Sequence, residues 1–339
     1  MPKTRIVFIG QNSRFSTIPL LAALERFDVV GIVESAPRHY APPVSITEHV
    51  YQALRTIFST PSTLSLKRIA RTNKVPYFFL DRTNSHELCE FLKYLGPDIV
   101  CVASMSQLLR KEVIEIPNYG TINLHPSLLP KYRGPNPWFW QYHQSESVGG
   151  VTVHFIDEGE DTGDIIKQAE YPIQLGMTSQ AMWDVAISHG TEILLEAIEE
   201  ISAGCIQTRS QRELPCPLRA RFVYPNESKL IDWENWSIER VWHIMRGTQE
   251  WFNAVPQPEG RYAGHRWLVG EIEYRPTRDK PGTIHEDDLG YYVAHSQGRI
   301  RLSLRFSTVK WAKVRARRLL RWSKAEASTQ GRIGGGASA

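Results

Sequence analysis

Three side chains with complementary chemistry lie in the middle part of this sequence. Asn123 and His125 are two residues apart, and Asp161 follows in an acidic stretch that contains glycine. An amide can donate a hydrogen bond to an oxyanion, an imidazole can move a proton near neutral pH, and a carboxylate can orient and charge that imidazole. On an extended segment, residues two apart point to the same face. The spacing therefore predicts one site to which Asn123 and His125 both point, with Asp161 holding His125 cationic.

The elements around these residues predict where that site lies. Residues 98–103 are nearly all apolar, as expected of a buried parallel strand. Residues 120–125 read as the next strand, which leads directly into a proline-rich loop over 126–137. Ligand sites of open α/β sheets lie at the carboxyl ends of the strands, so Asn123 and His125 are expected at such an end.

The opening of the chain predicts a βαβ unit. Strand-like runs at 5–10 and 29–33 flank a helix that Ser16 is placed to cap. The first loop contains only Gly10 and no GxGxxG pattern, which disfavours a dinucleotide site. Further strands are predicted at 75–79, 151–156 and from 165, and further helices at 85–95 and 179–201.

The overall pattern predicts an α/β fold with two domains. A Rossmann-like domain with a parallel sheet occupies 1–205, and its insertion at 36–75 is expected to form helices at about 45–58 and 62–74. Residues 206–225 are interpreted as a linker and 226–309 as a smaller, mainly-β, open-barrel-like domain. Residues 310–339 are interpreted as a basic helix followed by a flexible tail.

Composition limits the possible partners. The formal net charge is +4, and seven basic residues lie between Lys310 and Lys324, where they suit an anionic membrane surface, a nucleic acid or simply a solvated helix. The four cysteines form no CxxC pair, and no metal site is predicted. The apolar run near the N-terminus stops at Gly10, too early for a signal peptide, which favours a cytoplasmic location.

Four motifs in order resemble one enzyme family. They are Asn123–Pro130, Tyr132–Gly134, Gly150–His154 and Asp161–Ile166. Their order and spacing closely resemble the 10-formyltetrahydrofolate-dependent formyltransferases, which include glycinamide ribonucleotide, methionyl-tRNA and amino-sugar formyltransferases. The resemblance covers roughly residues 4–205.

The resemblance implies a catalytic trio and a folate slot. Asn123, His125 and Asp161 match the family's catalytic residues. The pteridine of 10-formyltetrahydrofolate is expected on two segments, through Met105, Gln107, Leu108, Leu109, Phe155, Ile156, Asp157, Glu158 and Gly159. Formyl transfer to an amine passes through a tetrahedral oxyanion, to which Asn123 can donate while His125 moves protons to the leaving nitrogen.

The acceptor amine is less constrained. Methionyl-tRNA enzymes typically carry Arg-Gly-Ala-Ala-Pro in the loop, whereas this chain has Arg133-Gly134-Pro135-Asn136-Pro137 followed by an aromatic cluster. This departure favours a small amine, such as a nucleotide-linked amino sugar, with methionyl-tRNA as the alternative. A non-catalytic folate-binding protein is disfavoured because the trio is complete. The expected substrate residues are Gly10, Arg133, Asn136 and Trp138.

Overall fold

The computed structural model describes residues 3–38, 40, 65–212 and 214–306. The expected helix at 45–58, the start of the one at 62–74 and the basic segment from Lys310 lie outside these residues. The chain divides into two compact units, Met1–Val223 and Tyr224–Ala339. None of the described helices is long and apolar enough to cross a bilayer.

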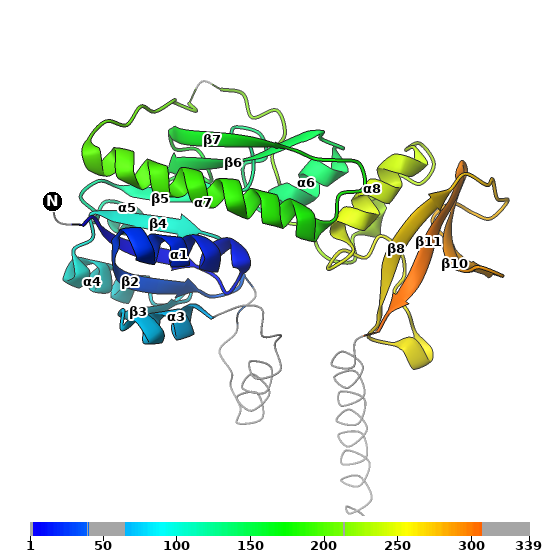
Figure 1. Ribbon diagram of the computed structural model, residues 1–339, viewed down its shortest axis with the longest axis horizontal. Coiled ribbons are helices and arrows are strands. Elements are labelled where there is room, and N and C mark those ends of the chain that lie inside the picture. Colours follow the sequence, from blue (N-terminus) through cyan, green and yellow to red (C-terminus); the bar gives the residue numbers. More distant parts are fainter. Residues whose placement is uncertain (1–2, 39, 41–64, 213, 307–339) are drawn as a thin grey trace, which may run out of the picture. The chain divides into compact units, whose positions relative to one another are not determined.

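The first unit is built on one sheet (Figure 1). Among its described residues, seven strands lie in the order β3-β2-β1-β4-β5-β6-β7. The strands are β1 (Arg5–Gly10), β2 (Asp28–Ser35), β3 (Tyr77–Leu80), β4 (Ile99–Ala103), β5 (Thr121–His125), β6 (Val148–Phe155) and β7 (Ile165–Pro172). The helices are α1 (Arg14–Arg26), α3 (Leu66–Asn73), α4 (Ser85–Leu95), α5 (Lys111–Ile114), α6 (Pro137–His143) and α7 (Ser179–Ala203).

The sheet is mixed rather than wholly parallel. The strands from β3 to β5 are parallel, but β6 runs antiparallel to both β5 and β7. A short loop without a helix joins β6 to β7, and such a connection permits only antiparallel pairing. The expected α/β architecture with a Rossmann-like parallel sheet is confirmed, and β6 adds an antiparallel edge to it.

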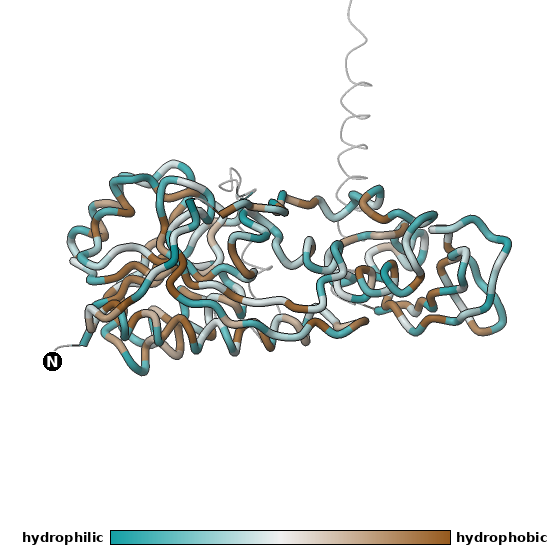
Figure 2. The backbone as a smooth tube through the Cα atoms, turned by 90° about the horizontal axis from the view of Figure 1, so that it is seen from above, coloured by the Kyte–Doolittle hydropathy of each residue, from teal (hydrophilic) through white to brown (hydrophobic). Residues whose placement is uncertain are grey.

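Alternating side chains of the central strands form the core on both faces of the sheet. Val7 and Ile9 of β1 pack with Leu88 and Leu92 of α4 on one face. Helices α1 and α7 contact each other on the other face (Figure 1). Hydrophobic stretches alternate with hydrophilic ones along the backbone of this unit (Figure 2). This double covering suits strands buried on both faces.

The start of α1 differs from the prediction. Ser13, not Ser16, is the N-cap residue. Ser16 is buried inside the helix, and its hydroxyl donates to the carbonyl of Ala103 at 2.6 Å. The helix start is therefore hydrogen-bonded to the end of β4, beside Gly10.

The second unit contains an antiparallel sheet. Its described residues form four strands in the order β8-β11-β10-β9: β8 (Arg266–Glu273), β9 (Ile284–Asp287), β10 (Gly290–His295) and β11 (Gly298–Arg305). Helix α8 (Ile238–Thr248) packs on β8 and β11, and its Trp242 indole donates to the Gly270 carbonyl at 2.6 Å. Two short 3-10 helices lie at Ser228–Leu230 and Gly260–Tyr262.

Candidate active site

The pairing of β5 with β6 brings the predicted catalytic residues together. Asn123 lies opposite His154 in the antiparallel register, and His125 lies opposite Thr152. Asp161 lies in the loop between β6 and β7, with a left-handed backbone at φ 56°. The loop thereby returns the carboxylate to the strand that carries Asn123 and His125.

The Asp161 carboxylate lies between two imidazoles. Its Oδ2 lies 3.5 Å from Nδ1 of His125, and its Oδ1 lies 3.6 Å from Nε2 of His154. The backbone N–H of Gly134 donates to Oδ2 at 2.9 Å. Burial by itself would raise the pKa of Asp161, but the two histidines and the Gly134 N–H hold it well below its ordinary range. The side chain is therefore a carboxylate at neutral pH.

Hydrogen bonds fix the orientation of the Asn123 amide. Nδ1 of His154 lies 2.7 Å from the Phe155 carbonyl, which can only accept, so we assign the hydrogen to Nδ1. Nε2 of His154 is then free to accept from Nδ2 of Asn123 at 3.1 Å. The same amide nitrogen makes a longer contact of 3.4 Å to Asp161. A substrate oxygen can replace this longer contact without disturbing the bond to His154.

The protonation of His125 differs from the prediction. Its side chain is buried, and burial lowers its pKa more than the nearby Asp161 raises it. The direction of this pKa shift does not support the expectation that Asp161 keeps the imidazole cationic, because desolvation opposes the attraction. Nε2 of His125 lies 3.0 Å from the Tyr132 carbonyl, which can only accept, so its hydrogen is assigned there. The lone pair of Nδ1 then faces Asp161, ready to take up a proton.

The two segments expected to bind folate lie together. Met105 and Leu109 from one, and Ile156 from the other, pack against the same apolar cluster. Lys111 forms an ion pair with Glu158 at 3.2 Å, which ties the two segments at the surface.

The remaining residues of these segments differ in their surroundings. Gln107 donates to the Leu80 carbonyl at 3.3 Å, and Asp157 accepts from Gly159 N–H at 3.0 Å. Leu108 is 69% exposed, so its side chain is available to a ligand. Phe155 lies at the end of β6, where its N–H donates to the Asp164 carbonyl.

The four expected substrate residues are mostly engaged within the protein. Arg133 donates to the side-chain oxygen of Gln211 through Nε at 3.1 Å and Nη2 at 2.9 Å. Asn136 precedes α6 and accepts from Val223 N–H at 3.1 Å. Trp138 makes an edge contact with Phe15, with ring centroids 5.5 Å apart. Gly10 lies so close to Ser16 that a Cβ there would come within 2.7 Å of the serine Cβ.

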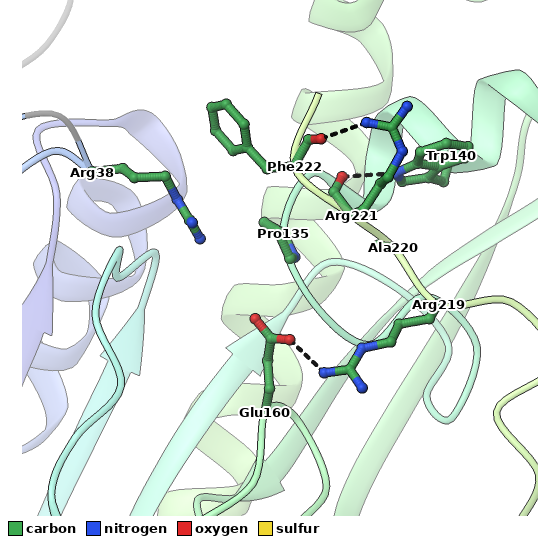
Figure 3. A pocket seen from close by; sticks show the side chains of 8 residues that line it. All are labelled: Arg38, Pro135, Trp140, Glu160, Arg219, Ala220, Arg221 and Phe222. Carbon is green, nitrogen blue, oxygen red and sulfur yellow. Dashed lines mark hydrogen bonds and ion pairs between the residues drawn. The ribbon is translucent and has the colours of Figure 1, made fainter. Parts of the chain in front are cut away.

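A pocket opens next to the catalytic cluster (Figure 3). It has a volume of 410 Å³ and is lined by Arg38, Pro135, Trp140, Glu160, Arg219, Ala220, Arg221 and Phe222. Glu160 adjoins Asp161 in sequence, and Pro135 adjoins Gly134, so the pocket and the cluster share the same loops. Among the described residues, no group of three or more His, Cys, Asp or Glu side chains is arranged to hold a metal.

The pocket combines positive charge with aromatic surface. Arg219 is paired with Glu160 at 2.7 Å, and Arg38 and Arg221 contribute two further guanidinium groups to the lining. Arg38 lies over the Phe222 ring at 5.1 Å, and Arg221 lies over the Trp140 ring at 5.3 Å. Such a lining suits an anionic ligand that carries a flat ring.

Three contributors lie outside the predicted trio. His154, which its place on a strand marks as a structural or supporting residue, lies opposite Asn123 because β5 and β6 pair antiparallel. The Tyr132 carbonyl and the Gly134 N–H are backbone groups, which residue type does not reveal. In the structure, the positive φ of Tyr132 and Gly134, 63° and 104°, marks this turn as unusual.

Comparisons with known proteins agree on one kind of enzyme. Residues 5–198 match the family model described as formyl transferase. A methionyl-tRNA formyltransferase of Clostridium acetobutylicum is 30% identical over 87% of this chain and 89% of its own length. Another, of Alkaliphilus metalliredigens, is 28% identical over 92% of this chain and 93% of its own length. The fold is similar to that of an N-formyltransferase of Helicobacter canadensis, which was crystallised with folinic acid and dTDP-3-aminofucose. The TM-score is 0.60, and the sequences are 17% identical over 90% of this chain and 100% of the other.

Proposed function

Because this chain belongs to the formyl transferase family and is an N-formyltransferase that uses 10-formyltetrahydrofolate, we propose that its acceptor is the amino group of methionyl-tRNA. The observation that carries this proposal is the extent of the similarity. The relative of Clostridium acetobutylicum that bears this activity in its name matches 87% of the chain, so the match extends beyond the first unit. The relatives thus favour the acceptor that the loop sequence ranked second.

A small amine, such as a nucleotide-linked amino sugar, is the second candidate. Its support is the loop Pro135-Asn136-Pro137-Trp138, which departs from the pattern typical of the tRNA enzymes. Trp138 packs edge-on against Phe15, which weakens the idea that this indole stacks on a sugar or base. Trp140 lines the pocket and is the better candidate for that role.

The catalytic cluster supports a direct transfer. The neutral amine of the acceptor attacks the formyl carbon, a C–N bond forms, and the carbonyl electrons move to oxygen. Asn123 donates to this oxyanion in place of its long contact to Asp161. The amine releases a proton, which neutral His125 accepts with the carboxylate of Asp161 beside it. The bond to the folate nitrogen then breaks, and that nitrogen takes up the proton, which gives the N-formylated acceptor and tetrahydrofolate.

The charged pocket supports a phosphate-bearing acceptor. Arg38 and Arg221 supply positive charge, and the rings of Phe222 and Trp140 supply stacking surface for a base. We infer that the terminal nucleotide of the acceptor lies in this pocket, which would bring its attached amine toward Asp161. A nucleotide-linked sugar would use the same groups.

One assay distinguishes the two acceptors. Tetrahydrofolate release is followed with charged initiator methionyl-tRNA and, separately, with dTDP-, GDP- and UDP-linked amino sugars. We expect turnover with the tRNA alone. Arg38→Ala and Arg221→Ala should each raise the KM for tRNA and reduce the slope of log affinity against log salt by about 1. Turnover with an amino sugar and none with tRNA would overturn the proposal in favour of the second candidate.

A further inference from the structure

The segment that follows α7 runs back over the catalytic loops. We name Arg209–Arg212 together with Leu214–Val223 the strap. Arg209 forms a β-bridge with Ile165, the first residue of β7. The carbonyl of Leu218 accepts from Tyr132 N–H at 2.6 Å, and Ala220 N–H donates to the Arg133 carbonyl at 2.9 Å. The strap was predicted as a linker, yet these bonds tie it to the turn whose backbone contacts His125 and Asp161.

Gln211 is the most deeply placed polar side chain of the strap. It is only 1% exposed. Its amide nitrogen donates to the Gly163 carbonyl at 2.6 Å and to the Asp161 carbonyl at 3.3 Å. Its side-chain oxygen accepts from Arg133 twice, and its backbone carbonyl accepts from Nη2 of Arg133 at 3.1 Å. One glutamine therefore joins the Asp161 loop to the loop that contains Gly134.

Asp161 needs such support because of its backbone. A non-glycine residue at positive φ is strained, and it keeps this conformation only when its surroundings fix it. The Gly134 N–H fixes the carboxylate, while Gln211 fixes the main chain of the same residue. An apolar side chain at position 211 would leave the carbonyls of Asp161 and Gly163 without this donor, and Arg133 with only the backbone carbonyl of residue 211 as an acceptor there.

We propose that Gln211 is a positioning residue for formyl transfer, which holds the left-handed turn at Asp161 so that its carboxylate faces His125 and Asn123. The strap is then part of the catalytic apparatus as well as the connection toward the second unit. The proposal rests on the catalytic role proposed above for Asp161.

The test replaces Gln211 by methionine, which has a similar shape and no hydrogen-bonding groups equivalent to the amide. In Gln211→Met we expect kcat to fall by about 10–100-fold, while the KM for 10-formyltetrahydrofolate stays within about twofold. A second measurement follows the His125 imidazole by NMR during a pH titration. The pKa of His125 should be lower in Gln211→Met than in the unaltered protein, because the displaced carboxylate no longer raises it.

Gln141→Met is the matched control. Gln141 is also a buried glutamine of the first unit, 2% exposed, and donates to the Pro126 carbonyl at 2.9 Å. This variant should lose stability without a change in the pKa of His125. An unchanged His125 titration in folded Gln211→Met would overturn the proposal, as would an equal change in the control.

A second variant covers the case in which Gln211→Met does not fold. Gln211→Glu keeps an oxygen for Arg133 but loses the donor to Asp161 and Gly163. We expect its kcat to fall similarly, and wild-type kcat in this variant would also overturn the proposal. Full turnover in Asp161→Asn would instead refute the catalytic role of Asp161, and the NMR titration would still report whether Gln211 positions that residue.

Discussion

At the scale of single residues, the catalytic amide depends on one histidine. Asn123 donates to Nε2 of His154, whose other nitrogen is bonded to the Phe155 carbonyl. Without His154 the amide is free to rotate toward Asp161. Loss of an oxyanion donor typically costs about 10²–10³ in rate, whereas a misplaced donor costs less.

We therefore expect Asn123→Ala to lower kcat by about 10²–10³-fold and His154→Leu by about 10-fold. The double variant should be no slower than Asn123→Ala alone, since His154 acts through the amide. Steady-state kinetics of the three variants test this. Multiplied losses in the double variant would mean that His154 has an independent role.

These residues also show what sequence can predict about a site. The types and spacing of Asn123, His125 and Asp161 suggested the chemistry, and the structure places the three side chains together. The charge of His125 was not predictable, because it depends on how completely the imidazole is removed from water. The contact between His154 and Asn123 was not predictable, because it depends on strand register, which the residue itself does not encode.

At the scale of elements, the catalytic turn lies in close contact with the strap. Gly134 has φ 104°, and a Cβ there would come within 2.5 Å of the Ala220 carbonyl oxygen. Gly134→Ala should therefore push the turn away from the strap and weaken the bond from Gly134 N–H to Asp161. We expect a loss of about 1–3 kcal/mol in the free energy of unfolding and a drop in kcat beyond that of the control.

Gly204→Ala provides that control. Gly204 also has a positive φ, 66°, but a Cβ there meets nothing within 4 Å. Backbone strain alone should also lower the thermal stability of this variant, but by less than in Gly134→Ala, and kcat should not change. If Gly134→Ala also retains full kcat, the turn does not position Asp161.

Elements with a strong periodic pattern were predicted well, and those defined by tertiary contacts were not. The helix at 85–95 has the expected bounds, and α7 begins at the expected Ser179 but ends at Ala203, two residues later than predicted, with Gly204 as its C-cap. The direction of β6 does not follow from the sequence, because a residue pattern does not state strand direction. The strap looked like a linker because its order comes from single side chains, such as Gln211, and from backbone bonds to distant loops.

At the scale of the whole molecule, the two units differ in where their titratable groups are buried. In the first unit the buried charge belongs to the catalytic cluster. In the second, His243 of α8 is buried away from that chemistry, and burial lowers its pKa to about 4. His295 is buried in the same unit, and its pKa is lowered by the same cause. These groups should make the second unit sensitive to mild acid.

The direction in which stability changes with pH follows from proton binding. An unfolded histidine titrates near about 6.5, so between that pH and about 4 the unfolded unit binds a proton that the folded unit excludes at His243. The contribution to stability is complete above about pH 6.5 and is lost as the pH falls toward 4. For His243 the loss amounts to at most roughly 3 kcal/mol. The Asp287 carboxylate does not interfere, because hydrogen bonds from Arg301 lower its pKa to about 2.

We expect His243→Gln to reduce the decrease in thermal stability of the second unit between pH 7 and 4.5, with the remainder due to His295. The amide retains hydrogen-bonding capacity but cannot titrate in this range. Calorimetry at several pH values measures the effect, and His86→Gln, on the exposed surface of α4, should leave the second unit's transition unchanged. The acid sensitivity could instead be equal in His243→Gln and the unaltered protein. In that case His243 accepts its proton without unfolding of the whole unit, and α8 opens locally first.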